Sequence, residues 1–170
     1  MKSLVRTSAV AAVALTGSLL TASPAVATVS AASQTAEQAV AFARPSNGKI
    51  LYDRYSGGRG VLKIKNGTSK DGVVTLVKGK TKAISLYVRA KSTASVKDVR
   101  DGTYRIYFTT GYRFSTSKGR FTKSAVYQRF DDRLRYRTTA TSYSIWTLTL
   151  HTVRGGKART SAIDPKDFPA

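Results

Sequence analysis

Residues 61–90 read VLKIKNGTSKDGVVTLVKGKTKAISLYVRA, and their regular alternation indicates the class of fold. Apolar and basic side chains alternate over 61–65, so one face of an extended chain there is apolar. Asn66-Gly67 follows at once and is a strong short-range signal for a turn between two strands. We therefore predict that 61–65 and 72–79 pair as a β-hairpin.

The same period-two pattern continues along the chain. It predicts further strands at 83–90, 93–99, 103–110, 124–129, 134–138 and 141–153. Clusters of Gly, Asn, Asp and Lys separate these runs, and the spacing is typical of an antiparallel β-sandwich. We expect an all-β fold, a single antiparallel β-sandwich of seven or eight strands, with an open barrel as the alternative. Residues 111–123 are predicted to form a long loop, and loops of that length often bind ligands.

The sequence before this pattern divides into two parts. Residues 1–27 have a basic start, an apolar run and the small-x-small site Ala25-Val26-Ala27, which is the order of a secretory signal peptide. The apolar run is shorter than the roughly 20 residues of a membrane span. Residues 28–59 are expected to be a flexible leader that ends in a glycine-rich link at 56–60, and residues 60–170 form the sandwich domain. We thus expect a secreted protein, extracellular or associated with the cell wall, with no transmembrane segment.

Composition excludes several chemistries. The chain has no Cys and a single His, so disulfides, thiolate metal sites and multi-histidine sites are ruled out. His151 has no Gly-x-Ser-x-Gly nucleophile motif to serve. Asp131 and Asp132 are adjacent, so on an extended chain they point to opposite faces and cannot flank one scissile bond. We predict no enzymatic activity, no cofactor and no metal, with a weak calcium site at these aspartates as the alternative.

The charge is the feature that points to a partner. The formal net charge is +20, and removal of residues 1–27 takes away Lys2 and Arg6 but no acidic residue, which leaves +18. Acid-free intervals at 72–97, 102–130 and 133–163 each contain six Lys or Arg. Strand parity groups some of them into basic stripes, namely Lys78, Lys80 and Lys82, and Arg133, Arg135 and Arg137.

Basic side chains interleaved with aromatic ones suit an anionic polymer, because the cations release counterions and the rings stack on sugars or bases. The candidate ligand-binding residues are Tyr112, Arg113, Phe114, Lys118 and Arg120 in the expected loop, with Arg133, Arg135 and Arg137. The partners that fit are an anionic cell-wall polymer, an acidic polysaccharide or extracellular nucleic acid. The alternatives are a protein-interaction or structural module whose charge is incidental, and a hydrolase or an inhibitor of one.

Several short motifs also carry a family resemblance. They are LKIKNGT (62–68), DGVVTLV (71–77), YVRA (87–90), DGTYR (101–105), FDD (130–132), WTLTL (146–150) and Gly155-Gly156. Together they resemble a family of uncharacterised small all-β domains exported by bacteria, over about residues 60–168. The resemblance implies an extracellular all-β domain and no particular activity. In that pattern the loop after 103–110 is acidic and contains Trp, whereas here it reads GYRFSTSKGR, which implies a more anionic ligand.

Overall fold

The computed structural model describes residues 44–151 and 158–169. The expected signal peptide, residues 1–27, lies outside this part of the chain, as do residues 28–43 and 152–157. No helix within the described ranges is long and apolar enough to cross a membrane.

The described residues form ten β-strands and one short 3-10 helix. The strands are β1 (Ile50–Asp53), β2 (Gly60–Asn66), β3 (Asp71–Lys78), β4 (Thr81–Val88), β5 (Ser92–Val99), β6 (Gly102–Ser115), β7 (Arg120–Phe130), β8 (Leu134–Tyr136), β9 (Ile145–Thr149) and β10 (Thr160–Ala162), and the helix η1 spans Pro165–Asp167. The predicted all-β sandwich is confirmed. The strand count exceeds the expected seven or eight because two further short edge strands form, β1 within the expected leader and β10 after the last predicted strand.

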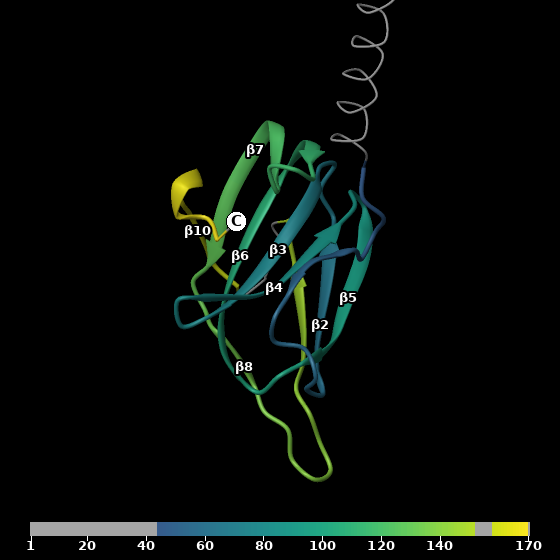
Figure 1. Ribbon diagram of the computed structural model, residues 1–170, viewed down its shortest axis with the longest axis vertical. Helices are drawn as coiled ribbons and strands as arrows, with labels where there is room; N and C mark the ends of the chain where they lie inside the picture. Colours follow the sequence, from purple (N-terminus) through teal and green to yellow (C-terminus); the bar gives the residue numbers. More distant parts are fainter. Residues whose placement is uncertain (1–43, 152–157, 170) are drawn as a thin grey trace, which may run out of the picture. The chain divides into compact units, whose positions relative to one another are not determined.

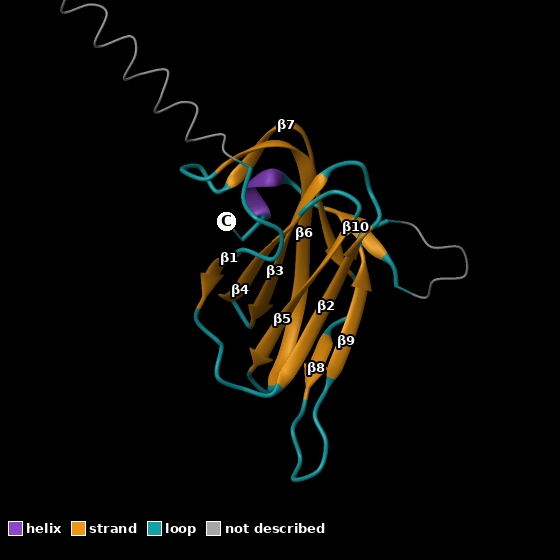
Figure 2. Ribbon diagram, turned by 90° about the vertical axis from the view of Figure 1, so that its right-hand side faces the viewer, coloured by secondary structure: helices purple, strands orange, loops and turns teal. Residues whose placement is uncertain are grey.

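The strands form two sheets (Figure 1; Figure 2). The larger has seven strands in the order β1-β4-β3-β6-β7-β10, with β8 paired to the start of β6, and the smaller has the order β5-β2-β9. Neighbouring strands are antiparallel except β2 and β9, which are parallel. Most apolar side chains of the alternating strands meet between the sheets, where burial of each large one contributes roughly 1.5–3 kcal/mol. Fully buried examples are Leu62, Ile64, Val74, Leu76, Ile84, Leu86 and Ile106.

The predicted hairpin between β2 and β3 is wrong. β2 pairs with β5 and β9, whereas β3 pairs with β4 and β6, so the Asn66-Gly67 segment carries the chain from one sheet to the other. The buried Asn66 side chain supplies the hydrogen bonds of this corner. Its Nδ2 donates to the carbonyl oxygens of Lys70 (2.8 Å) and Arg89 (3.1 Å), and its Oδ1 accepts from the backbone N–H of Thr68 (3.1 Å). These bonds hold a sharp crossing that a two-residue hairpin turn does not require.

The expected leader also needs correction, because residues 44–59 belong to the folded domain. β1 forms an edge of the larger sheet through its pairing with β4, and Arg44 is bound to Asp71 at the start of β3. The glycine-rich segment 56–60 is packed rather than a flexible link, since the N–H of Gly58 donates to the carbonyl of Asp98 at 2.8 Å. The period-two signal is too short in β1 to reveal a strand from sequence.

The predicted loop at 111–123 is a β-hairpin. β6 continues to Ser115, β7 begins at Arg120, and Gly119 in the turn has φ +62°. Phe114 and Phe121 face each other across the two strands with their ring centroids 5.1 Å apart. This aromatic pair stabilises a strand pairing that the Gly, Ser and Lys content of the segment disguises.

Two buried tyrosines give a matched test of the core. The hydroxyl of Tyr136 is buried with no hydrogen-bond partner among the described residues, whereas that of Tyr104, whose ring lies edge-on to Tyr136, donates to the carbonyl of Arg100 at 2.8 Å. A buried hydroxyl without a partner costs stability, and a bonded one contributes about 1 kcal/mol. We expect Tyr136→Phe to leave the free energy of unfolding unchanged or raise it by about 1 kcal/mol, and Tyr104→Phe to lower it by about 1 kcal/mol. Urea denaturation followed by the fluorescence of Trp146 measures both, and a destabilised Tyr136→Phe would contradict this account.

Candidate functional site

Most basic side chains of the domain have no acidic partner. Within 44–151 and 158–169, the only ion pairs join Arg44 to Asp71 (2.6 Å) and Lys166 to Asp164 (3.5 Å). Three other aspartates accept hydrogen bonds from uncharged groups. They are Asp53, bound by the N–H of Ser56, Asp101, bound by the N–H and hydroxyl of Thr138, and Asp131, bound by the hydroxyl of Ser161. The carboxylates therefore hold loops in place, and the positive excess is left facing solvent.

The predicted site residues lie at opposite ends of the larger sheet. β8 pairs with Gly102–Tyr104, the first residues of β6, whereas the β6–β7 turn follows its last residue, Ser115. Figure 1 shows β8 at the lower end and the top of β7 at the upper end. A strand rises about 3.3 Å per residue, so the two groups are on the order of 40 Å apart along β6. They form two surfaces, and no small ligand can contact both.

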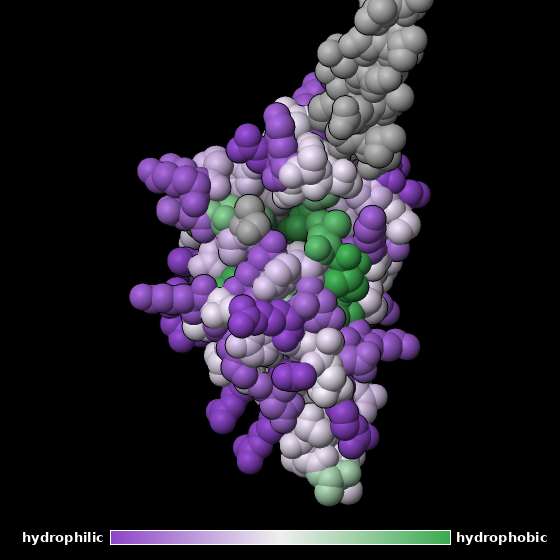
Figure 3. Space-filling model, in the orientation of Figure 1, coloured by the Kyte–Doolittle hydropathy of each residue, from purple (hydrophilic) through white to green (hydrophobic). Residues whose placement is uncertain are grey.

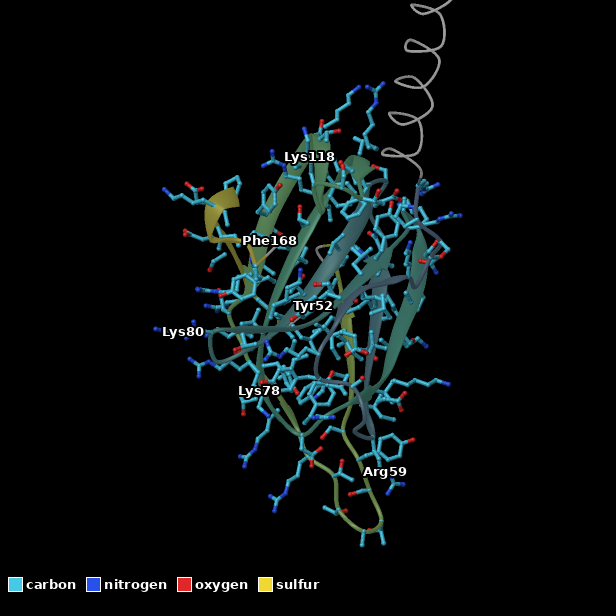
Figure 4. The ribbon with its side chains drawn as sticks, in the orientation of Figure 1. Tyr52, Arg59, Lys78, Lys80, Lys118 and Phe168 are labelled. Atoms are coloured by element: carbon cyan, nitrogen blue, oxygen red, sulfur yellow. The ribbon has the colours of Figure 1, made fainter. Side chains whose placement is uncertain are left out.

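At the lower end the predicted alternation is confirmed. Arg133, Arg135 and Arg137 are exposed, while Leu134 and Tyr136 between them are buried. This end also carries exposed aromatic rings that sequence analysis did not select. The guanidinium of Arg59 lies 5.5 Å from the ring centroid of Tyr143, and Trp146, which is 38% exposed, donates from Nε1 to the carbonyl of Arg135 at 3.1 Å. Figure 4 places Arg59 in this lower region.

At the upper end the predicted residues separate into three groups. Phe114 is only 3% exposed and packs against Tyr87 (5.2 Å between centroids) and Phe121, so its predicted stacking on a ligand is wrong. Tyr112 is exposed, with Lys70 Nζ 5.8 Å from its ring centroid, and Arg113 beside it in β6 is also exposed. Lys118 and Arg120 line a hollow on the outer face of the sheet.

This hollow, called the larger hollow below, has a volume of about 610 Å³ and lies against β6 and β7. Its lining comprises Thr109, Lys118, Gly119, Arg120, Tyr127, Asp164, Pro165, Lys166 and Phe168. β10 pairs with the edge of β7, and the segment after it brings Phe168 onto the outer face, where its ring lies 5.3 Å from that of Tyr127. Figure 4 shows Lys118 above Phe168 on this face. The sequence pattern did not indicate that Phe168 lies beside a basic turn.

A smaller hollow of about 260 Å³ shares Gly119 and Phe168 with the larger one. Its lining includes Lys49, Lys82, Thr75 and Ser85, and the hydroxyls of Thr75 and Ser85 hydrogen-bond to each other at 2.9 Å. The ammonium of Lys82 lies 4.8 Å from the ring centroid of Tyr52, and burial lowers the pKa of this lysine. The smaller hollow therefore continues the basic lining toward β4.

The charged side chains that line the two hollows are almost all basic. Five basic side chains line them, namely Lys49, Lys82, Lys118, Arg120 and Lys166, and the single lining carboxylate, Asp164, is paired with Lys166. Apolar residues gather in the upper half of this face, with hydrophilic side chains around them (Figure 3). A positively charged concave surface with aromatic walls attracts anions and strengthens contacts that exclude water. Of these five cations, Lys118 and Arg120 were predicted to bind ligand and Lys82 was predicted to lie in a basic stripe, whereas Lys49 and Lys166 were not predicted.

No grouping of acidic and histidine side chains suited to a metal occurs in the described part of the chain. His151, the single histidine of the sequence, is exposed and lies against the backbone of Gly67. Neither hollow has His151, Asp131 or Asp132 in its lining. The residues that do line the two hollows can bind a ligand through charge, hydrogen bonds and aromatic contact.

No family model matches the chain, and neither the curated proteins nor the solved structures include a significant match. The resemblance to exported all-β domains stays a prediction.

Proposed function

We propose that this is an exported, non-enzymatic module that binds anionic polymers, chiefly through the outer face of its seven-stranded sheet. The observation that carries the proposal is the lack of acidic partners: in the described ranges only Arg44 and Lys166 are ion-paired, although the full chain has 29 Lys and Arg against 9 acidic residues. A solubility role needs a net charge of only about 2–8 for a small domain. The export part of the proposal rests on residues 1–27.

Binding of this kind is driven by the release of counterions from the polymer as Lys and Arg replace them. Rings near the cations, such as Tyr127 and Phe168 at the larger hollow, add apolar and stacking contacts. A polymer seated there reaches the smaller hollow over the shared Gly119 and Phe168, and a long one can also reach the arginines beside β8. Cell-wall phosphopolymers, acidic polysaccharides and extracellular nucleic acid are the partner classes.

The salt dependence of binding tests the proposal. Each phosphate contact contributes about 0.7–0.9 to the slope of log K against log salt, so replacing Lys118, Arg120 and Lys166 by Gln is expected to lower that slope by about two to three. The reference variant replaces Arg133, Arg135 and Arg137 by Gln. With oligomers much shorter than the sheet, we expect the salt slope to fall only in the variant at Lys118, Arg120 and Lys166. With long polymers, we expect it to fall in both variants.

The measurement is a titration of the purified protein with a teichoic-type phosphopolymer, single-stranded DNA and an acidic polysaccharide at several salt concentrations, with neutral peptidoglycan as the uncharged control. Equal affinity for the neutral polymer, or the absence of binding at physiological salt, would overturn the proposal. It would then favour the protein-interaction module, whose binding to a defined protein partner is insensitive to salt.

A further inference from the structure

Thr109 carries a polar group that the fold leaves unused. Its side chain is 1% exposed, and its Oγ1 has no hydrogen-bond partner within residues 44–151 and 158–169. The register explains why, since its neighbours across β3 and β7 are Val73 and Tyr127, and valine has no polar side-chain atom. On the same outer face Thr75 and Ser85 are also cross-strand neighbours, and they satisfy each other. A buried hydroxyl without a partner lowers stability, so its presence at the larger hollow needs a reason.

The groups around Thr109 indicate which kind of ligand could hydrogen-bond to its hydroxyl. Tyr127 and Phe168 supply apolar ring surface on one side, and Lys118, Arg120 and Lys166 supply positive charge. The volume of about 610 Å³ lies within the roughly 300–1,000 Å³ of small-molecule sites. A matching ligand has an apolar face, at least one hydroxyl and a negative charge.

We infer that the larger hollow binds a single sugar ring that carries a negative charge, as a phosphate or a carboxylate. The C–H face of the ring lies on Tyr127 and Phe168, its anionic group binds Lys118, Arg120 and Lys166, and one of its hydroxyls bonds to Thr109 Oγ1. The inference rests on the proposed function and narrows it, because such a ring is the repeating unit of an acidic cell-surface glycan. A nucleobase can also hydrogen-bond to Thr109 through its ring nitrogens and exocyclic groups, so a nucleotide is the comparison that separates the two ligand classes.

The test uses glucose 6-phosphate and glucuronic acid as probes, with glucose, inorganic phosphate and adenosine monophosphate as comparisons. Titrations of the protein followed by amide chemical shifts are expected to move Thr109, Tyr127 and Phe168 with at least one of the two acidic sugars. Glucose lacks the anionic group and inorganic phosphate lacks the sugar ring, so both are expected to bind at least tenfold more weakly. The acidic sugar that binds identifies phosphate or carboxylate as the anionic group.

Thr109→Val removes the hydroxyl and keeps the shape of the side chain. We expect it to lower the affinity for the acidic sugar five- to tenfold, whereas Thr109→Ser is expected to bind the sugar as the wild type does. Because the hydroxyl bonds to no other group in the described part of the chain, the Val variant is expected to unfold at the same or a higher urea concentration than the wild type, which separates lost binding from lost folding.

Three results would overturn the inference and leave the proposed function standing: a salt-sensitive polymer that binds while neither acidic sugar shifts these residues, adenosine monophosphate that binds as well as the sugars, or a Val variant with unchanged sugar affinity. Failure of every polymer to bind would instead remove the proposed function.

Discussion

Replacing Asp71 with alanine is expected to lower the free energy of unfolding by about 2–4 kcal/mol. The Asp71 side chain is 13% exposed and accepts four hydrogen bonds. Arg44 donates two, at 2.8 and 2.6 Å, the hydroxyl of Tyr87 donates one at 2.6 Å, and the N–H of Ala90 donates one at 2.8 Å. The variant leaves the buried Tyr87 hydroxyl and the Ala90 N–H without an acceptor. It also releases Arg44, which joins the N-terminal segment to β3.

The matched control is Asp132→Ala. Asp132 is exposed, with no hydrogen bond or ion pair from its side chain to another described residue, so its loss is expected to change stability by no more than about 0.5 kcal/mol. Urea denaturation followed by Trp146 fluorescence gives both values. Equal stabilities for the two variants would show that the Asp71 network contributes little.

The same network gives the stability a defined pH dependence. Burial alone raises the pKa of Asp71, but the hydrogen bonds from Arg44, Tyr87 and Ala90 outweigh it and hold the pKa below its usual value. The carboxylate therefore stabilises the folded protein fully above the unfolded pKa of about 3.9, and this contribution is lost as the pH falls through the lower, folded pKa. The difference in stability between the wild type and Asp71→Asn is expected to narrow below about pH 4 and to stay constant between pH 5 and 7.

Replacing Gly58 with alanine is expected to cost about 3 kcal/mol or more. A Cβ at this position would lie 2.5 Å from the Cα of Arg100 and 2.6 Å from the carbonyl carbon of Val99. These are backbone atoms at the turn between β5 and β6, so no side-chain rotation relieves the contact. The backbone of residues 55–58 is also hydrogen-bonded to this turn, through Gly58 N–H to Asp98 and Arg100 N–H to Tyr55.

Gly79 supplies the comparison in the β3–β4 turn. A Cβ there meets no atom within 4 Å, but its φ of +63° lies in the left-handed region, so Gly79→Ala is expected to cost about 1 kcal/mol. Denaturation midpoints and slopes of both variants test the difference. If Gly58→Ala were as stable as Gly79→Ala, residues 55–58 would be able to shift away from the β5–β6 turn at little cost, which would contradict the close packing described here.

Sequence alone predicted the strands in which one face is buried and the other is solvated. Burial alternates along β2, along β5 as far as Lys97, and at Leu134 and Tyr136 among the exposed arginines, because every second side chain of a strand points to the same face. The pairing of those strands was not predictable from Asn66-Gly67, since the Asn66 side chain bonds both to Lys70, just before β3, and to Arg89, just after β4. A local turn signal carries no information about which sheet the next strand joins.

The candidate site shows the same limit more strongly. Lys118 and Arg120 were identified from composition, but the hollow that they line also requires Thr109, Tyr127 and Phe168. Thr109 and Tyr127 become neighbours only through the β6–β7 register, and Phe168 reaches them only after β10 has paired with β7. Nothing in the local pattern around Thr109 marks its hydroxyl as lacking a partner, because that follows from the identity of Val73 on another strand.

The parallel pairing of β9 with β2 has a kinetic consequence. Val61 lies opposite Ile145, 84 positions later in the chain, and β2 is the central strand of its sheet. Until residues 145–149 arrive, one edge of β2 has no partner, and the entropy of closing that long loop must be lost before the contact stabilises anything. Proteins dominated by such distant pairings fold in milliseconds to seconds, far more slowly than helical bundles. We therefore expect completion of the smaller sheet to be the slow step of folding.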